Sequence, residues 1–535
     1  MKIDGIPFKQ TGYFSKLIVD YLEEKEGLKS FYNRFPTFEN FKDQIKEKKD
    51  NFPKSHRNVL VAALKHQYKN TTASELTKSN IDSLLDENAF TIVTGHQLNL
   101  FTGPLYFLHK IIATINLAKK LKEKYPENTF VPVYWMATED HDFEEINYFN
   151  LNGKKLQWNK KVSGAVGKLD TNGLEAVCDT LSSELGSSTN AKYLVELFAE
   201  AYLKHNNLTE ATRYLANELF KDYGLVIVDG DDADLKQLLV PYVKSDLFDN
   251  TSFKNVSASL EKLNQLPENY SVQVNPREIN YFYLIDGIRE RIIEKKGTFY
   301  INDTVLSFTK SEILTELEKH PERFSPNVVC RPLYQEVILP NLCYIGGGGE
   351  IAYWLELKAY FNAVEVPFPM LLLRNSVLLV TEKQREKVEK LDLTIADLFL
   401  KQNTFINKKI RAISNIDIDF SPQKKQLEEQ FQYLYSIAEQ TDKSFLGAVK
   451  AQEVKQLKGL DALEKRLLKA QKRKLKDHVI RITEIQNELF PNKSLQERQQ
   501  NFSQFYLEYG QNLIPTLVAN LEPLTKNFEV LVLKN

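Results

Sequence analysis

A strand, a helix and a second strand follow one another between residues 89 and 142, and this order constrains the fold more than any other feature. The apolar run AFTIVTG ends at Gly95, and an amphipathic stretch follows it, with Pro104 near the expected first helical turn, where proline is tolerated. FVPVYWMATEDHD is a second apolar run, which ends in charged residues. Strand–helix–strand units build parallel sheets, so we expect an α/β fold.

Three further apolar runs extend the predicted sheet. We predict a Rossmann-like core whose parallel strands lie near residues 90–94, 131–136, 224–228, 342–345 and 368–373. Two inserted connecting segments interrupt it, a mostly helical one at 151–220 and one with short strand candidates and a helix at 250–326. The core is therefore expected in three parts, at 89–150, 221–249 and 327–376.

Helical segments flank this core. Apolar residues at steps of three and four predict an N-terminal helical segment over residues 1–88. A helical connector, 377–421, leads to residues 422–489, where apolar residues recur at coiled-coil steps and predict a helical hairpin or a dimer zipper. A C-terminal helical segment, 490–535, is expected to return to the core.

The overall composition argues against several classes of protein. With 70 basic and 71 acidic residues the net charge is −1, so the charge balance favours binding neither to nucleic acid nor to an anionic membrane surface. Cys178, Cys330 and Cys343 are too few and too scattered for a disulfide framework or a CxxC zinc site. The N-terminus has no apolar secretory signal, and no apolar run reaches the roughly 20 residues of a membrane helix. We therefore expect a cytoplasmic protein.

Four of the predicted strands end in unusual residues. They are followed by TGHQ (94–97), EDHD (139–142), DGDD (229–232) and GGGGEIAYW (346–354). Ligands of an open α/β sheet bind beyond the carboxyl ends of its strands. We therefore expect the four segments to converge on one crevice.

The TGHQ and GGGG segments are candidates for binding a nucleotide. Glycines let a ligand lie against the chain, and the helix that follows each segment offers free N–H groups to a phosphate. Neither segment is a Walker loop or a GxGxxG fingerprint. His109, at mid-helix, is explained equally well as a structural histidine, and core packing is the simpler role for at least one of Tyr353 and Trp354. The candidate nucleotide-binding residues are Thr94, Gly95, Gln97, His109, Lys110, Arg331, Gly346, Gly347, Gly348, Gly349 and Glu350.

The EDHD segment supplies most of the candidate catalytic residues. Three carboxylates and an imidazole this close together repel one another unless a cation, a substrate amine or buried hydrogen bonds compensate them. On an extended segment Asp140 and Asp142 face the same way, so we assign this pair to a substrate ammonium. His141 then faces away, unless the chain has already turned into a helix. The alternative is an N-capping acidic turn without a catalytic role. His96, at the end of the first strand, is the fourth candidate, and no residue is predicted to bind a metal.

In this order the motifs resemble the BshC family, the cysteine ligase of bacillithiol biosynthesis. The resemblance covers residues 89–375, and the coiled coil also fits the family. Family members often carry Gln where His96 stands and Pro where Gly348 stands, and the first departure argues against an essential imidazole at position 96. The motifs that carry the resemblance are TGHQLNLFTGPLYFLHK, PVYWMATEDHDFEEIN, GLVIVDGDD, SPNVVCRPLYQEVILP and GGGGEIAYW.

The resemblance implies a ligase with two small-molecule substrates. Cysteine is added to glucosaminyl malate to form bacillithiol, and ATP, alone or with Mg²⁺, is the expected activator of the cysteine carboxylate. The resemblance also implies a core related to class I aminoacyl-tRNA synthetases and a homodimer formed through the coiled coil. No Cys pair offers a zinc site.

Two other functions stay open on the sequence. EDHD and DGDD have the acids to hold two cations in a metal-dependent hydrolase or phosphoesterase. A non-catalytic coiled-coil scaffold with a nucleotide-sensing crevice is the second alternative. The four glycines favour a nucleotide over a bare hydrolase, and the two insertions favour a two-substrate enzyme over a scaffold.

Overall fold

The chain consists of two units. The computed structural model describes residues 2–534. A core unit comprises the residues up to Leu379 and those from Gln496 onward, and a coiled-coil unit comprises Val380–Leu495.

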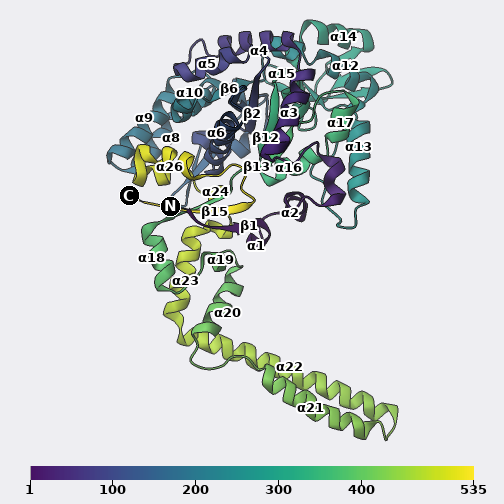
Figure 1. Cartoon of the computed structure of the whole chain (residues 1–535), viewed down its shortest axis with the longest axis vertical. Helices are drawn as coiled ribbons and strands as arrows, with labels where there is room; N and C mark the ends of the chain where they lie inside the picture. The colour runs from purple at the N-terminus through teal and green to yellow at the C-terminus, as the bar shows by residue number, and fades with distance from the viewer. Residues whose placement is uncertain (1, 535) are drawn as a thin grey trace. The chain divides into compact units, whose positions relative to one another are not determined.

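A five-stranded parallel sheet forms the centre of the core unit, in the order β13-β12-β2-β3-β6 (Figure 1). Its strands are β2 (Ala89–His96), β3 (Thr129–Met136), β6 (Val226–Asp229), β12 (Asn341–Gly346) and β13 (Met370–Leu373). The predicted Rossmann-like fold and its five strands are therefore confirmed. Gly95 pairs with Trp135 and Gly346 with Leu373, so neighbouring strands end at one edge of the sheet.

Helices α6 (Tyr106–Lys124) and α3 (Phe38–Asn51) bury this sheet. Phe41 of α3 and Leu117 of α6 lie in one apolar cluster with Phe90 of β2, and all three side chains are fully buried. Burying a side chain of this size stabilises the fold by about 1.5–3 kcal/mol. Every residue of β2 is buried, as expected for a parallel strand covered on both faces.

The two insertions differ in structure. The first contains a hairpin and three helices: β4 (Tyr148–Leu151), β5 (Lys154–Gln157), α8 (Glu175–Leu185), α9 (Thr189–Leu203) and α10 (Leu208–Phe220). The second forms an antiparallel sheet in the order β10-β9-β8-β7-β11, next to α14 (Lys310–Lys319). Its strands are β7 (Tyr281–Ile285), β8 (Ile288–Lys295), β9 (Thr298–Ile301), β10 (Ser307–Thr309) and β11 (Phe324–Pro326).

The segments at both ends of the core unit depart from the all-helical prediction. A second small sheet joins β1 (Lys2–Pro7), β15 (Asn527–Leu533) and β14 (Val377–Thr381). The β-branched and aromatic residues of NFEVLVL favour a strand, and β15 is almost wholly buried between its neighbours. The prediction of helix alone before residue 89 and beyond 376 is therefore wrong at these three strands.

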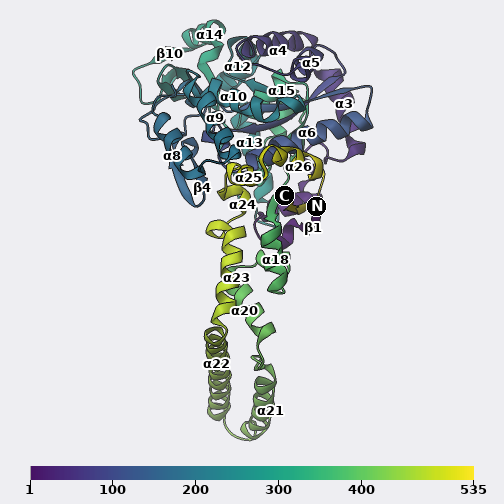
Figure 2. The ribbon, with the colours of Figure 1, turned by 90° about the vertical axis from the view of Figure 1, so that its left-hand side faces the viewer.

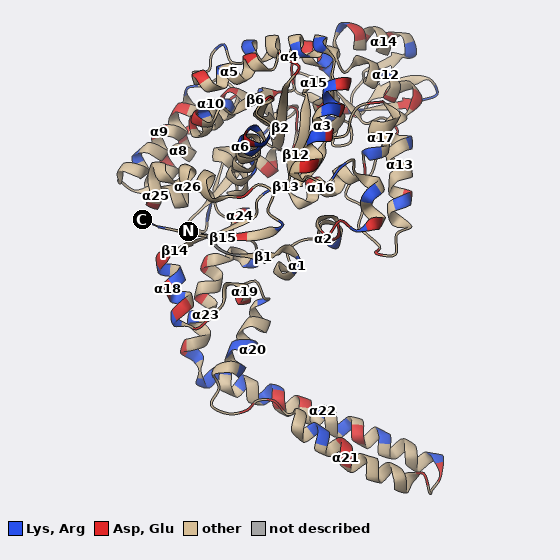
Figure 3. Cartoon of the chain, viewed as in Figure 1, with Lys and Arg blue, Asp and Glu red and all other residues tan. Residues whose placement is uncertain are grey.

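The coiled-coil unit is built from helices packed side by side. Its main helices are α18 (Glu382–Lys390), α20 (Gln402–Ile413), α21 (Ser421–Ala438), α22 (Lys443–Lys474) and α23 (Lys476–Leu489). Figure 2 shows α21 and α22 running next to each other, and Phe431, Ala438 and Val449 form the buried contact between them. Lys and Arg are interspersed with fewer Asp and Glu along α22 (Figure 3).

Candidate active site

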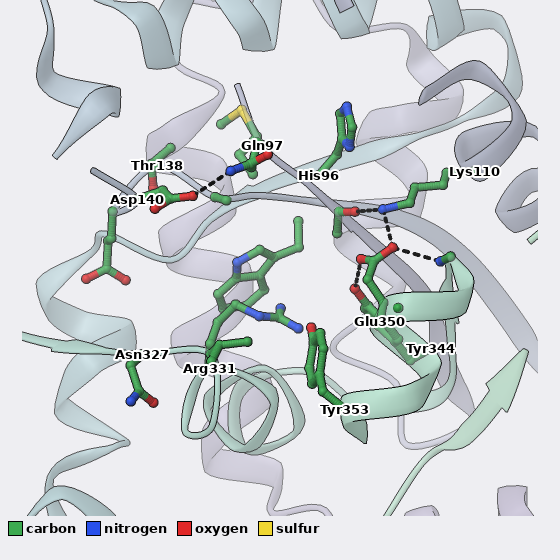
Figure 4. A pocket seen from close by; sticks show the side chains of 18 of the residues that line it. His96, Gln97, Lys110, Thr138, Asp140, Asn327, Arg331, Tyr344, Glu350 and Tyr353 are labelled. Carbon is green, nitrogen blue, oxygen red and sulfur yellow. Dashed lines mark hydrogen bonds and ion pairs between the residues drawn. The ribbon is translucent and has the colours of Figure 1, made fainter. Parts of the chain in front are cut away.

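A cavity of about 680 Å³ opens in the core unit, where β2, β3 and β12 end (Figure 4). The segments after these strands line it, together with α6, the second insertion and the short helix α24 (Gln496–Gln499). Most of the predicted site residues lie in its wall: Gly95, His96, Gln97, Lys110, Asp140, His141, Arg331, Gly347, Gly348, Gly349 and Glu350.

Four other predicted residues lie outside the cavity lining: Thr94, His109, Asp142 and Gly346. Thr94 is buried and its hydroxyl donates to the carbonyl of Ile345 at 2.7 Å, which ties β2 to β12. His109 is fully buried, and its Nδ1 lies 3.3 Å from Glu497 Oε2. Asp142 is exposed and precedes α7 (Phe143–Ile146), outside the cavity lining.

The geometric prediction for EDHD is wrong in one respect. The Asp140 N–H donates to the carbonyl of Ala137 at 3.2 Å, so the chain turns directly after β3 and does not continue as a strand. Side chains of a turn do not alternate between two faces. For this reason His141, and not Asp142, lines the cavity together with Asp140.

The glycine loop, Gly346–Gly349, leads from β12 into α16 (Gly348–Leu355). None of these four glycines has a positive φ, so the backbone conformation does not require glycine. A Cβ on Gly346 would lie 2.9 Å from the Cβ of Glu350, whereas one on Gly349 would meet nothing within 4 Å. A Cβ on Gly347 or Gly348 would make ordinary van der Waals contacts at 3.4 Å or more. Gly346 is thus needed for packing, and Gly349 leaves open space beside the first turn of α16.

Cations gather around the glycine loop. Lys110 Nζ lies 2.6 Å from Glu350 Oε2 and donates to the carbonyl of Gly95 at 2.8 Å. Burial lowers the pKa of Lys110. Burial alone would raise the pKa of Glu350, but the Lys110 charge and the hydrogen bonds from Lys110, Gly347 and Tyr344 together hold that pKa below its ordinary value. The other cations of the cavity wall at this end are Arg331, Arg374 and Arg498.

Two of these arginines have buried donor atoms without a partner. Arg331 lies between the rings of Trp135 and Tyr344, each 5.6 Å from its guanidinium carbon. Arg374 is 3% exposed and its Nη2 donates to Glu497 at 2.8 Å. Arg331 Nη2 and Arg374 Nε find no hydrogen-bond acceptor in the described part of the chain. A buried guanidinium donor left unsatisfied is costly, so this end of the cavity is suited to an anion.

The opposite end of the cavity is acidic, and Figure 4 shows Gln97 and Asp140 there, across from Lys110 and Glu350. Gln97 Nε2 donates to Asp140 Oδ2 at 2.9 Å, and the backbone N–H of His141 donates to Oδ1 at 2.8 Å. These bonds hold the Asp140 carboxylate in place at the cavity wall. Glu139, by contrast, is buried against Lys236, and burial raises its pKa.

The DGDD segment does not reach the cavity, which corrects the expectation that four strand ends converge there. Asp229 accepts from the hydroxyl of Thr138, and Asp231 pairs with Lys236 at 3.6 Å. The Asp232 side chain caps α11 (Ala233–Gln237). These acids are satisfied within the protein, and only three of the four predicted segments, TGHQ, EDHD and GGGG, line the cavity.

His96 touches the cavity but is enclosed by aromatic rings. Its ring lies 5.4 Å from that of Tyr106 and 5.0 Å from that of Phe107. Burial, with the charges of Lys110 and Arg374, holds its pKa well below the ordinary value. In Figure 4 the ring points away from Asp140 and Glu350, so the imidazole is placed for packing.

The structure separates the two aromatic residues after the glycine loop, of which at least one was expected in the core. Tyr353 lines the cavity, whereas Trp354 is fully buried and stacks on Tyr344, so only Tyr353 is available to a ligand.

Two arginines of the wall were not predicted as site residues from the sequence. Arg289 comes from β8, and Arg498 follows the coiled-coil unit. Their distance along the chain from the strand ends left no local signal in the sequence.

Two family models together match nearly the whole chain. The Bacillithiol biosynthesis BshC N-terminal Rossmann-like domain matches residues 1–375, and the BshC C-terminal coiled-coil domain matches residues 377–533. The chain belongs to the BshC family. The resemblance of its motifs to this family is thereby confirmed.

Several similar proteins carry one name, "Putative cysteine ligase BshC". The protein of Christiangramia forsetii is 61% identical over 99% of both chains, and that of Flavobacterium johnsoniae is 61% identical over 100% of both. That of Bacillus cereus strain B4264 is 28% identical, over 97% of this chain and 98% of its own. A solved structure from Campylobacter jejuni, named for an arginyl-tRNA synthetase, covers 85% of this chain and 99% of its own, with 11% identity and a TM-score of 0.20, too weak a likeness to carry an argument.

Residues 2–534 contain no group of three or more His, Cys, Asp or Glu side chains arranged to hold a metal ion. Among the described helices, none has both the length and the apolar character to span a bilayer.

Proposed function

We propose that this chain is a cysteine ligase of bacillithiol biosynthesis, which joins the carboxyl group of cysteine to the amine of glucosaminyl malate. Membership of the BshC family supports the reaction class, since its relatives are named for it. One observation carries the assignment to the cavity: it is cationic at one end and carries a positioned carboxylate at the other.

The cationic end is the proposed site for the cysteine carboxylate and the phosphates of ATP. The unpartnered donors of Arg331 and Arg374 would find acceptors in these anions. The open space beside Gly349 lets an anion approach the N–H groups of the first turn of α16. Bound ATP, alone or with Mg²⁺, would supply the activation that lets the cysteine carboxyl carbon lose an oxygen.

The acidic end is the proposed site for the amine of the acceptor. Asp140 is held by Gln97 and by the His141 backbone, so its carboxylate can pair with an ammonium without first reorganising. An ammonium has no lone pair, so it must lose one proton before its nitrogen attacks the activated carboxyl carbon, and Asp140 is placed to accept that proton. The nitrogen loses a second proton to solvent as the amide forms and the activated oxygen leaves.

The geometry favours this ligase over a two-cation hydrolase. That hydrolase would need EDHD and DGDD to face one site, but Asp231 and Glu139 both turn to the buried Lys236. A non-catalytic scaffold would have no use for a carboxylate fixed on the cavity wall opposite the anion site.

A reconstitution assay tests the proposal. The purified full chain is incubated with cysteine, glucosaminyl malate, ATP and Mg²⁺, and the products are identified by mass spectrometry, with each component omitted in turn. We expect the amide product only when cysteine, acceptor and ATP are all present. Amide formation that does not depend on ATP would refute the assigned cofactor, and no amide under any condition would refute the ligase.

We further propose that the protein is a cytoplasmic homodimer held together by the coiled-coil unit. Large apolar side chains along α21, α22 and α23 are exposed, including Tyr433 at 70% and Leu463 at 52%. A second copy of the same helices would cover them, as in a coiled-coil dimer. All three cysteines are free and buried, which suits a reducing compartment.

A further inference from the structure

We propose that Arg289 is a substrate-binding residue that recognises a carboxylate of the acceptor at the acidic end of the cavity. The inference rests on the proposed ligase function and extends it to the second insertion, since Arg289 belongs to β8 of that insertion. The proposed acceptor is an amino sugar whose glycosidic substituent carries a carboxylate.

Contacts on three sides hold the Arg289 guanidinium at the cavity. Nη1 lies 2.6 Å from His141 Nδ1, Nε donates to Ser325 Oγ at 3.1 Å, and the guanidinium carbon lies 4.1 Å from the centre of the Phe282 ring. Phe282, His141 and Arg289 all line the cavity. The side chain is therefore fixed at the wall before any substrate binds.

This guanidinium has no carboxylate of its own. Within the described residues it forms no ion pair, although Glu139 and Asp140 are close enough for their charges to act on its pKa. Glu139 forms an ion pair with Lys236, and Asp140 accepts a hydrogen bond from Gln97. A half-buried cation without a counter-ion, next to a cavity, is suited to an anionic substrate group.

The contact with His141 also defines what that imidazole can do. A guanidinium has only donor hydrogens, so His141 Nδ1 must accept and the ring carries its proton on Nε2. With Nδ1 engaged and Nε2 protonated, His141 cannot take a proton from the acceptor amine. His141 is thus a hydrogen-bond donor beside the carboxylate site, and Asp140 is left as the base.

Asp140 and Arg289 are linked through His141. The backbone N–H of His141 donates to Asp140 Oδ1 at 2.8 Å, and its Nδ1 lies 2.6 Å from Arg289 Nη1. All three residues line the cavity, so a carboxylate and a guanidinium face it on the same part of the wall. An acceptor that carries both an amine and a carboxylate could engage both groups, the amine at Asp140 and the malyl group at Arg289.

The test compares two acceptors in wild-type protein and in Arg289→Gln. One acceptor is glucosaminyl malate, and the other is methyl glucosaminide, which has the same amine but no carboxylate. We expect the wild type to prefer the malyl acceptor by at least tenfold in kcat/KM and Arg289→Gln to lose most of that preference, with KM for cysteine and ATP within twofold of wild type. Arg291→Gln, on the same strand but outside the cavity lining, is the matched control and should keep the preference.

Each outcome decides the inference. An undiminished preference in Arg289→Gln overturns it and leaves the ligase function standing, whereas a wild type that forms no product with any acceptor overturns both. If Arg289→Gln fails to fold by circular dichroism, Arg289→Lys replaces it. Lysine keeps the positive charge but lacks the two parallel N–H donors of a guanidinium, so we expect this variant to retain part of the preference for the malyl acceptor. Full retention of the preference would show that the guanidinium geometry has no role.

Discussion

At the scale of single residues, the site contains two kinds of charged side chain. Some are paired within the protein, and others are still accessible from the cavity. Glu497 belongs to the first kind, because its Oε1 accepts from Arg374 and its Oε2 from the backbone N–H of Val377. The Asp140 carboxylate accepts a hydrogen bond from Gln97 and also lines the cavity. This difference separates residues needed for stability from residues needed for the reaction.

Replacing Asp140 by Asn should lower kcat/KM for ligation at least tenfold, about 1.4 kcal/mol of transition-state stabilisation, with little change in melting temperature. The amide keeps the shape of the side chain but can neither pair with an ammonium nor accept its proton. Asp142→Asn is the control, since Asp142 is exposed and outside the cavity lining. Equal activity in the two variants, measured by initial rates, would assign EDHD a purely structural role.

Glu497→Gln should cost about 3–5 kcal/mol of unfolding free energy, because it leaves Arg374 buried without a counter-charge. Burial opposes the ionised form of Glu497, but Arg374 lowers its pKa to about 2, below the ordinary value of 4.5. A depressed pKa stabilises the fold above pH 4.5, and this contribution is lost as pH falls from 4.5 towards 2. Urea unfolding at pH 7 and pH 4 checks this, and a variant as stable as wild type at pH 7 would contradict it.

At the scale of elements, the glycine loop is the part whose role follows most directly from its surroundings. Gly349→Val should weaken ATP binding at least tenfold, because its side chain fills open space beside α16, while the fold tolerates it. Gly346→Ala should instead destabilise the protein by about 1–3 kcal/mol, since its Cβ would lie 2.9 Å from that of Glu350. Calorimetric titration of ATP and thermal melting separate the two effects. Normal ATP affinity in Gly349→Val would place the nucleotide elsewhere.

The elements differ in how well they could be predicted from the sequence. The five core strands were predicted correctly because each is an apolar run that is buried on both faces. β8, IRERIIEK, was missed because its half-exposed charged residues do not form an apolar run. The partners of a site residue depend on tertiary packing: no local pattern places Arg289 beside His141, or Arg374 beside Glu497. The turn after β3 likewise places His141, and not Asp142, in the cavity wall. The sequence alone was compatible with a turn or with an extended segment at this point.

At the scale of the whole molecule, the coiled-coil unit and the core unit have separate tasks in this account. The chain mass is 61.9 kDa, and sedimentation equilibrium at micromolar concentration should give about twice that value. Leu463→Glu puts a charge in the exposed apolar stripe of α22 and should shift the equilibrium towards monomer without unfolding the core unit. A wild type that sediments as a monomer would show that α21 and α22 pack only within one chain.

If the cavity uses ATP to activate the cysteine carboxyl group, one oxygen of that group must pass to a phosphate, and an isotope transfer experiment detects this directly. Cysteine labelled with ¹⁸O in its carboxyl group is turned over with ATP and glucosaminyl malate, and the phosphate-containing products are analysed by mass spectrometry. We predict one ¹⁸O atom in the phosphate or AMP released per amide formed, with the transfer reduced in parallel with the activity of Arg331→Gln. Amide formation with no ¹⁸O in any phosphate-containing product would contradict the account.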